Sequence, residues 1–269
     1  MMTKTIGFIG TGNMGSAIIK GLLNSDFTRP ENIIASRRNT VLLTIMKDDW
    51  GIQATPDNKE VAMKADILFL AVKPHMYEGV IKEIRDEVSA DTIIVNIAAG
   101  VSIADVETYF GRSMKVARAM PNTPSLVGEG MIGVCFNERV SEDEQDEIVD
   151  LFSNLGKAEV ITEDLINAVI GVSGSSPAIL YMVIEALADS AVKNGMPRAQ
   201  AYTFAAQAMV GAGKMVLDTG EHPGKLKDDV CSPGGGTIEA VIVAEDKGLR
   251  SAIMAAMDAT VQKSIRMEK

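Results

Sequence analysis

The sequence is short of the residues from which metal sites and acid–base catalytic pairs are usually built. Its 269 residues include two cysteines and two histidines, and aromatic residues make up 4%. Cys135 and Cys231 lie far apart without metal-ligand spacing, so we expect reduced thiols and no bound metal ion. His75 and His222 have no evident catalytic partner, and a structural or solvent-facing role is favoured for His75 over proton transfer.

Positive charge is also scarce. Lys and Arg total 26 against 36 Asp and Glu, a net charge of −10, which argues against nucleic acid or an anionic membrane as partner. The first residues enter a strand without a basic and apolar leader, so we expect no secretory signal and a cytoplasmic protein. Residues 165–184 carry no charge. Asn167, three serines and several Gly or Pro breaks nevertheless favour a buried core segment over a membrane span.

A glycine-punctuated turn near the start organises the first half of the chain. Apolar residues lead to Gly10, and Gly12 and Gly15 complete the spacing G-x-G-x-x-G before apolar residues on one helical face. This order of strand, tight turn and helix is typical of dinucleotide-binding folds. There the helix N-terminus offers free N–H groups and a positive dipole end to a pyrophosphate.

The second strand of this pattern ends at Ser36-Arg37-Arg38. A dinucleotide fold places an acidic residue at this point when the cofactor is NAD, because a carboxylate binds the ribose hydroxyls. No acid is present, and guanidinium groups match the oxygens of a 2′-phosphate. We therefore expect NADPH as the cofactor. NADH is the alternative, in which the two arginines merely lie in a solvated loop.

Strand and helix patterns alternate through the first half. Residues 67–72 form a continuous apolar run, as expected of a central parallel strand that is buried on both faces. Seven or eight strands alternating with helices predict an α/β fold with a Rossmann-type, doubly wound, mostly parallel sheet. We place this dinucleotide-binding domain at residues 1–161. The expected strands are 5–10, 33–35, 52–54, 67–72, 92–97, 115–120, 131–136 and 157–161.

Residues 162–269 are predicted to form an all-α domain. Helices are expected at 177–194, 199–217 and 238–267, the last broken near Gly248. Their apolar residues lie on nearly every face, which requires burial. One small bundle has too little interior for several such helices, so we expect a homodimer in which a second subunit covers them. A self-contained bundle is the alternative.

Three consecutive glycines precede a helix start in this second half. Gly234, Gly235 and Gly236 follow Ser232-Pro233 and lead into Thr237. They place several N–H donors at a helix N-terminus. The arrangement predicts an anion site of the size of a carboxylate, and the Thr237 hydroxyl can either cap the helix or donate to a ligand. The alternative is an ordinary loop between helices.

These features together resemble the pyrroline-5-carboxylate reductases, the last enzymes of proline synthesis. The resemblance implies a Rossmann domain followed by a helical domain that binds substrate and interleaves with its dimer partner. It also implies dimers that can assemble further into rings of five. The most specific match is Lys227–Thr237. The matching motifs, in family order, are Gly7-Phe-Ile-Gly-Thr-Gly12, Ala71-Val-Lys-Pro-His75, Ala98-Ala-Gly-Val101, Asn122-Thr-Pro124, Gly171-Val-Ser-Gly-Ser175, Pro177-Ala178 and Lys227-Asp-Asp-Val-Cys-Ser-Pro-Gly-Gly-Gly-Thr237.

The resemblance also assigns residues to the two sites. Substrate is expected at Gly235, Gly236 and Thr237, with Glu163 nearby. Two departures leave roles open, since Asp229 stands where many relatives have Asn and Cys231 where relatives often have Ser. The implied cofactor-binding residues are Ile9, Gly10, Thr11, Gly12, Asn13, Met14, Ser36, Arg37, Arg38, Asn58, Ala71, Val72, Lys73, Pro74, Ile97, Ala98 and Ala99.

The reaction implied by the resemblance is hydride transfer from NADPH to the C=N carbon of 1-pyrroline-5-carboxylate, which gives proline. We expect Thr237 to be the catalytic residue, hydrogen-bonded to the imine nitrogen while the loop holds the carboxylate. Two alternatives remain. One is a β-hydroxyacid dehydrogenase with Lys214 as the acid, and the other is a non-catalytic NADP-binding redox sensor.

Overall fold

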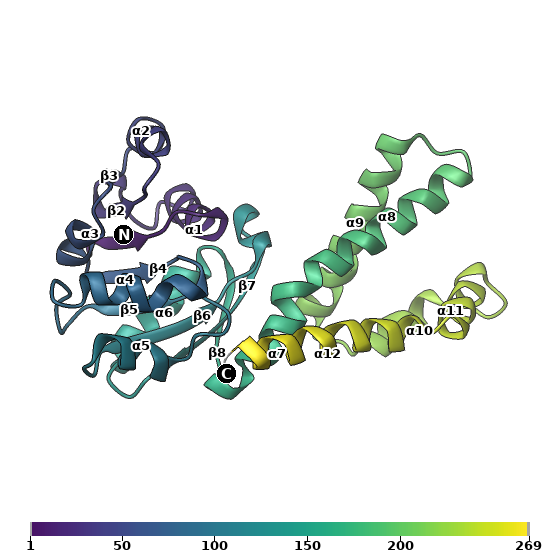
Figure 1. Ribbon diagram of the computed structural model, residues 1–269. Coiled ribbons are helices and arrows are strands. Elements are labelled where there is room, and N and C mark those ends of the chain that lie inside the picture. The colour runs from purple at the N-terminus through teal and green to yellow at the C-terminus, as the bar shows by residue number, and fades with distance from the viewer. Residues whose placement is uncertain (1, 268–269) are drawn as a thin grey trace. The chain divides into compact units, whose positions relative to one another are not determined.

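The computed structural model describes residues 2–267, which form two compact units (Figure 1). The α/β unit contains residues 2–175 and 260–267, and the helical unit contains Ser176–Ala259. Helical structure starts at Glu163, whereas the compact units separate at Ser176. The boundary after residue 161 therefore stays a prediction.

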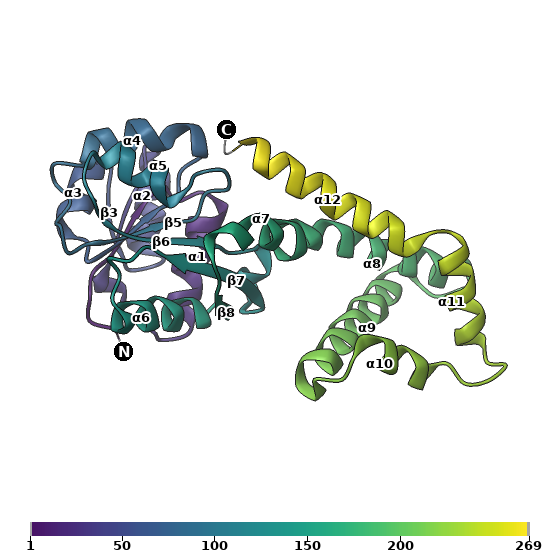
Figure 2. The same ribbon diagram turned by 90° about the horizontal axis from the view of Figure 1, so that it is seen from below.

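An eight-stranded sheet forms the centre of the α/β unit (Figures 1 and 2). Its order is β3-β2-β1-β4-β5-β6-β7-β8, and all neighbouring strands are parallel except β6 and β7. The predicted doubly wound, mostly parallel sheet is confirmed. The strands are β1 (Ile6–Ile9), β2 (Ile33–Ser36), β3 (Gln53–Thr55), β4 (Ile67–Leu70), β5 (Ile93–Asn96), β6 (Lys115–Met120), β7 (Gly130–Phe136) and β8 (Gly156–Val160).

Helices cover both faces of this sheet and create two separate hydrophobic clusters. One cluster joins apolar side chains of α1, α2 and α6 to the sheet, and the other joins those of α3, α4, α5 and α7. Every residue of β1, β2, β4 and β5 is buried between these layers, which explains why these strands are apolar except for Ser36 and Asn96 at their ends. The helices are α1 (Asn13–Asn24), α2 (Thr40–Asp48), α3 (Asn58–Lys64), α4 (Tyr77–Ile84), α5 (Ile103–Phe110), α6 (Glu142–Ser153) and α7 (Ile166–Val169).

Side-chain caps explain where several of these helices begin. Ser102 and Asp105 form a reciprocal capping box on α5, and Ser141 and Glu144 form another on α6. Each box satisfies N–H groups that have no partner within the helix. A serine followed three residues later by an acidic residue is the sequence pattern that marks such a helix start.

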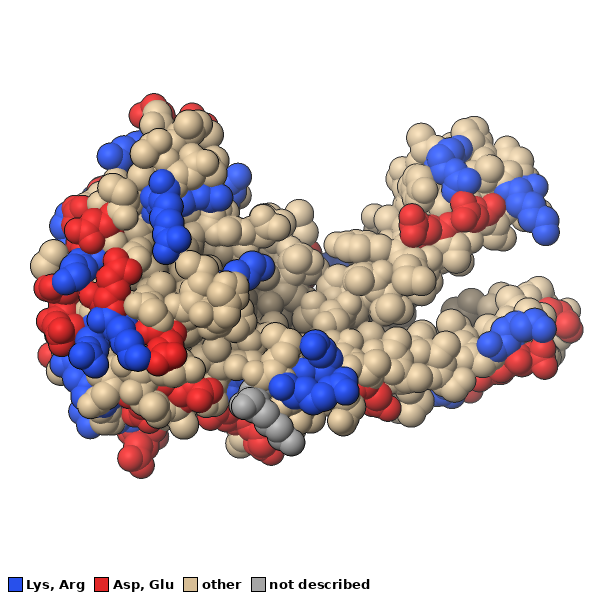
Figure 3. All heavy atoms as spheres, viewed as in Figure 1, with Lys and Arg blue, Asp and Glu red and all other residues tan. Residues whose placement is uncertain are grey.

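The helical unit consists of long helices that bury little of their apolar surface within one chain. Its small internal cluster centres on Ala188, Ala201 and Ala205, where α8 and α9 pack. Large apolar residues such as Tyr181, Phe204 and Met254 are exposed, and Figure 3 shows long stretches of this unit without charged side chains. The helices are α8 (Ser176–Lys193), α9 (Arg198–Thr219), α10 (Pro223–Val230), α11 (Gly236–Asp246) and α12 (Leu249–Met267), whose last residues, from Thr260, belong to the α/β unit.

Two features of the second half bear on the expectations from the sequence. Residues 223–230 form helix α10, whose first turn is capped by His222 through Nδ1, although no helix was expected there. Glu163–Lys193 is a continuous helical stretch, long and apolar enough by composition to cross a membrane, yet only 22% of its most apolar window is buried. This segment is therefore mostly exposed in a single chain, and its interpretation as buried core stays a prediction that depends on the expected second subunit.

Candidate cofactor and substrate sites

The glycine turn after β1 has the geometry that its sequence predicts. Gly10 adopts a positive φ of 90°, and a Cβ there would lie 2.8 Å from the Ala71 carbonyl oxygen. A Cβ on Gly15 would lie 2.7 Å from the Gly10 carbonyl oxygen. The turn and helix α1 are thus packed too closely against backbone for any larger residue at either position. Gly12, in contrast, faces open space.

The N-terminus of α1 is suited to an anion. Its N-cap is Gly12, which provides no side-chain hydrogen bond to the first turn. The first N–H groups of a helix have no intrahelical acceptor, and together with the helix dipole they attract a phosphate. We therefore expect a pyrophosphate to bind on the side of the turn where Gly12 faces open space.

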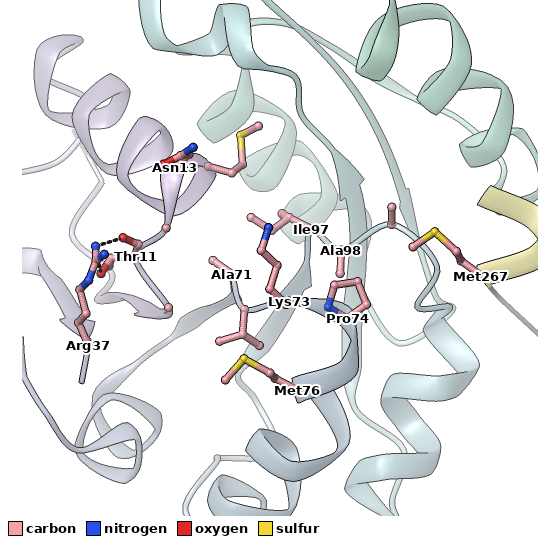
Figure 4. Close-up of a pocket in the computed structure, with 15 residues that line it drawn as sticks. Thr11, Asn13, Arg37, Ala71, Lys73, Pro74, Met76, Ile97, Ala98 and Met267 are labelled. Atoms are coloured by element: carbon pink, nitrogen blue, oxygen red, sulfur yellow. Dashed lines mark hydrogen bonds between the residues drawn. The ribbon is translucent and has the colours of Figure 1, made fainter. Parts of the chain in front are cut away.

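A cavity of about 900 Å³ opens at this turn (Figure 4). It lies at the carboxyl ends of β1, β4 and β5, next to the point where the strand order reverses between β1 and β4. Ligands of doubly wound sheets bind in this crevice, and the volume is within the usual range for a small-molecule site. The lining residues are Gly10, Thr11, Gly12, Asn13, Met14, Arg37, Ala71, Val72, Lys73, Pro74, Met76, Ile97, Ala98, Ala99 and Met267.

Most of the predicted cofactor residues come together around this cavity. Ile9, Ser36, Arg38 and Asn58 are the exceptions and lie outside its lining. Figure 4 shows Arg37 directed towards Thr11, and its guanidinium donates a hydrogen bond to the Thr11 carbonyl. The cofactor roles of all these residues stay predictions.

Two methionines of the cavity were missed. Met76 lies in the 3-10 turn Pro74–Met76, so extending the Lys73-Pro74 motif by two residues would have included it. Met267 comes from the end of α12, and no local sequence signal connects it with the glycine turn. His75, in the same 3-10 turn, is exposed and outside the lining.

Glu163 is held by other residues of the α/β unit. Its Oε1 accepts hydrogen bonds from the Ile103 N–H at 2.8 Å and from Arg118 Nη1 at 2.9 Å. The Arg118 side chain is only 3% exposed, so the carboxylate compensates a buried positive charge. Burial, together with the negative charge of Glu163, raises the pKa of the neighbouring Cys135 thiol to about 12. Cys135 is therefore an unreactive, neutral thiol.

The predicted substrate loop belongs to the helical unit. Gly235 is the N-cap of α11 and provides no side-chain hydrogen bond, and Thr237 is the second residue of that helix, with an exposed side chain. Thr237 is thus not the N-cap, which leaves its hydroxyl available to a ligand. The Asp229 carboxylate accepts a hydrogen bond from Lys225 Nζ at 2.8 Å. Cys231 is a partly exposed free thiol.

The fold and the cavity define a dinucleotide-dependent oxidoreductase with a Rossmann-type domain. Residues 5–100 match the family model described as NADP oxidoreductase coenzyme F420-dependent, and residues 163–267 match pyrroline-5-carboxylate reductase dimerisation. The chain is 50% identical over 268 residues to a pyrroline-5-carboxylate reductase of Escherichia coli, with 100% of both chains covered. The chain belongs to the pyrroline-5-carboxylate reductase family.

Solved structures agree with this assignment. A pyrroline-5-carboxylate reductase from Coxiella burnetii matches with a TM-score of 0.92 and 33% identity, and 100% of both chains is covered. The Plasmodium falciparum pyrroline carboxylate reductase, solved with NADP bound, matches with a TM-score of 0.91 and 30% identity, again over 100% of both chains. The predictions of family, fold class and a nicotinamide cofactor are confirmed, and the two alternative functions are not supported.

Proposed function

We propose that this protein reduces the C=N bond of 1-pyrroline-5-carboxylate with NADPH and forms L-proline, the last step of proline biosynthesis. The observation that carries the proposal is the cavity at the carboxyl ends of β1, β4 and β5, in a chain of this family. It combines a glycine turn for a pyrophosphate with a wall of small residues that a flat ring can approach closely.

In this proposal different segments around the cavity bind different parts of the dinucleotide. The segment Ile9–Met14 and the N-terminus of α1 hold the pyrophosphate. Ser36, Arg37, Arg38 and Asn58 form the adenosine end. The loops Ala71–Pro74 and Ile97–Ala99 hold the nicotinamide, which supplies the hydride when the cofactor is bound.

The preference for NADPH over NADH is supported by the end of β2. Ser36 is buried, and the next residues, Arg37 and Arg38, bring two guanidinium groups and no carboxylate. A carboxylate would repel a 2′-phosphate, whereas guanidinium groups bind it with charge-assisted hydrogen bonds.

The substrate is held by the loop that begins α11. The N–H groups of Gly235, Gly236 and Thr237 bind the substrate carboxylate at the helix N-terminus. The imine binds with its nitrogen protonated, so that hydride addition to the carbon gives the neutral amine and NADP. The Thr237 hydroxyl hydrogen-bonds this nitrogen, and the bond can strengthen in the step because the nitrogen gains a lone pair that accepts it. Glu163, at the start of the helical segment, also belongs to the substrate site in this proposal. Arg118 and the Ile103 N–H fix the position of its carboxylate.

We further propose a cytoplasmic homodimer that assembles into a pentamer of dimers. Residues 162–269 form the domain that dimerises and binds substrate, while residues 1–161 bind the cofactor. Support for the dimer comes from the exposed apolar side chains of the helical unit, which would be unfavourable in water without a partner.

One steady-state assay tests the proposed function. Addition of pyrroline-5-carboxylate to the protein and NADPH should produce continuous loss of NADPH absorbance and equimolar proline. A hydroxy acid with NADP serves as the comparison substrate, and the dehydrogenase alternative expects turnover there. Tight NADPH binding without turnover of either substrate would contradict the proposed reaction and favour the redox sensor.

A further inference from the structure

The last turns of helix α12 belong to the α/β unit. The helix runs through Leu249–Met267, and its residues from Thr260 onwards are part of that unit. Ser264 is 4% exposed, and Thr260, Val261 and Ile265 are partly buried. These positions have the spacing i, i+1, i+4, i+5, which places them on one face of the helix. One face of the helix end therefore packs against the α/β unit.

The helix end lies against the loop that follows β5. Gly100 has a positive φ of 78°, and a Cβ there would lie 3.0 Å from the Met267 Cβ and 3.3 Å from the Met267 carbonyl oxygen. Glycine thus gives the loop both a left-handed conformation and room for the helix end. The preceding residues of the same loop, Ile97–Ala99, line the cofactor cavity. The contact at Gly100 therefore places the end of α12 beside one wall of the cavity.

The loop beneath Met267 is held in place by Asn96, the last residue of β5. The Asn96 side chain is completely buried. Its Oδ1 accepts the Ala98 N–H at 2.9 Å, and its Nδ2 donates to the Val101 carbonyl at 2.8 Å. The backbone is thus fixed on both sides of Gly100, and the helix end rests on an ordered part of the wall.

The side chain of Met267 is itself part of the cavity lining. It is 46% exposed, and Figure 4 shows its thioether directed towards Ala98 and Pro74, with Arg37 at the opposite end of the cavity. Met267 therefore offers an exposed, flexible apolar group at the end where the surrounding residues are small and apolar. Thioether sulfur makes favourable contacts with aromatic rings, so this group is suited to cover a flat ring.

We propose that Met267 is a cofactor-contacting residue, whose side chain covers the nicotinamide ring and shields it from water. The inference rests on the proposed function, which places this ring at the loops Ala71–Pro74 and Ile97–Ala99, and it adds the end of the chain to that site. Exclusion of water strengthens the electrostatic interactions within an active site and prevents side reactions. The glycine turn and Arg37 lie away from Met267, so the contact affects only ligands that carry the nicotinamide ring.

Methionine oxidation tests this contact without any turnover. Hydrogen peroxide converts an accessible methionine to its sulfoxide, and mass spectrometry of the peptides gives the rate at each site. The internal control is Met63 on α3, which is 59% exposed and lies outside the cavity lining. The two ligands are NADP and 2′-phospho-ADP-ribose, a fragment that lacks the nicotinamide ring. NADP is used because NADPH is a reductant and would consume the oxidant.

We expect NADP to slow oxidation of Met267 by about fivefold or more, because the ring covers the exposed sulfur. The fragment should leave the rate at Met267 unchanged, and neither ligand should change the rate at Met63. Oxidation of Met267 that NADP does not slow, or that the fragment slows equally, would overturn the contact.

Three variants give an independent measurement. Met267→Ala removes the apolar side chain, Met267→Leu keeps most of its volume, and Met63→Ala is the control. Only Met267→Ala should raise the Kd of NADPH, by about fivefold, while the Kd of the fragment and Tm stay close to those of the wild type. An unchanged Kd for NADPH in Met267→Ala would overturn the proposal. A wild-type protein in which NADP protects Met267 but pyrroline-5-carboxylate is not reduced would contradict the proposed function and support the contact.

Discussion

The Ser36 hydroxyl donates a hydrogen bond to the Asn58 side-chain oxygen, with 2.7 Å between Oγ and Oδ1. Asn58 Nδ2 in turn donates to Glu83 Oε2 at 3.0 Å. Both ends of the Asn58 amide thus have partners, and its orientation next to the end of β2 is fixed. Arg37 lines the cavity, whereas Ser36, Arg38 and Asn58 lie outside its lining, and we expect the charges of the two arginines that follow Ser36 to distinguish the two cofactors.

Replacing Arg37 and Arg38 by alanine should change cofactor preference. Charge-assisted hydrogen bonds to a 2′-phosphate are lost, so we expect the KM for NADPH to rise about tenfold or more while that for NADH changes little. Steady-state kinetics with both cofactors measure the ratio, and Arg29→Ala, an exposed arginine elsewhere on the surface, is the control. A parallel rise in both KM values would assign the arginines to the phosphate turn in general.

Thr237→Ala should damage catalysis more than stability. Gly235 is the N-cap of α11, so loss of the Thr237 hydroxyl leaves the cap in place and Tm should change little. We expect kcat/KM for pyrroline-5-carboxylate to fall at least about tenfold, with an unchanged Kd for NADPH in fluorescence titration. Thr237→Ser keeps the hydroxyl and should restore most of the activity. Normal turnover by the alanine variant would remove Thr237 from the chemistry.

Charge introduced into the exposed apolar faces should prevent assembly. Leu187 on α8 is 48% exposed and Phe204 on α9 is 61% exposed in a single chain. Leu187→Asp and Phe204→Asp place a carboxylate in a surface that must be desolvated on association, so we expect insoluble or dissociated protein. Light scattering at micromolar concentration measures this. Unchanged, active oligomers of both variants would place the interface elsewhere.

The two cysteines should differ in reactivity. The pKa of Cys135 is raised to about 12 by burial, so alkylation with iodoacetamide near pH 8 should modify Cys231 and leave Cys135 intact until the protein unfolds. Mass spectrometry of the alkylated peptides gives the result. Rapid modification of native Cys135 would show that the region around Arg118 and Glu163 opens.

The raised pKa of Cys135 also predicts that the stability of the protein depends on pH. The unfolded thiol loses its proton near its ordinary pKa of 9.0, whereas the folded thiol keeps it up to about 12. The unfolded state alone is therefore stabilised by ionisation between these values, and the free energy of unfolding should fall as pH rises through that window by at most about 1.4 kcal/mol per unit. Urea unfolding of wild type and Cys135→Ala isolates the contribution, which should vanish below about pH 8.

Local patterns were sufficient to predict most of the sheet and the glycine turn. The buried strands β1, β4 and β5 have apolar runs, and Ser102 and Ser141 start helices with acids three residues later. Glycine is required at positions 10 and 15 because a Cβ at either position would lie too close to a backbone carbonyl oxygen. Each of these features depends on short-range chemistry, which a single sequence displays.

Features that depend on contacts between residues far apart in the sequence could not be predicted from local patterns. Met267 reaches the cavity from the other end of the chain, and Glu163 is held by Arg118 and Ile103, neither of which is near it in sequence. Helix α10 was missed because its Lys and Asp residues give a polar pattern, although Pro223 after a capping His222 is a regular helix start.

The exposed apolar helices make the stability of this enzyme a function of its own concentration. For a dimer whose protomers cannot cover these faces alone, the folded state is favoured by mass action. Each tenfold dilution removes about 1.4 kcal/mol per mole of dimer. A cell that reduces synthesis of the chain therefore lowers the stability of every remaining molecule. The heat resistance of the protein thus declines with its concentration in the cell.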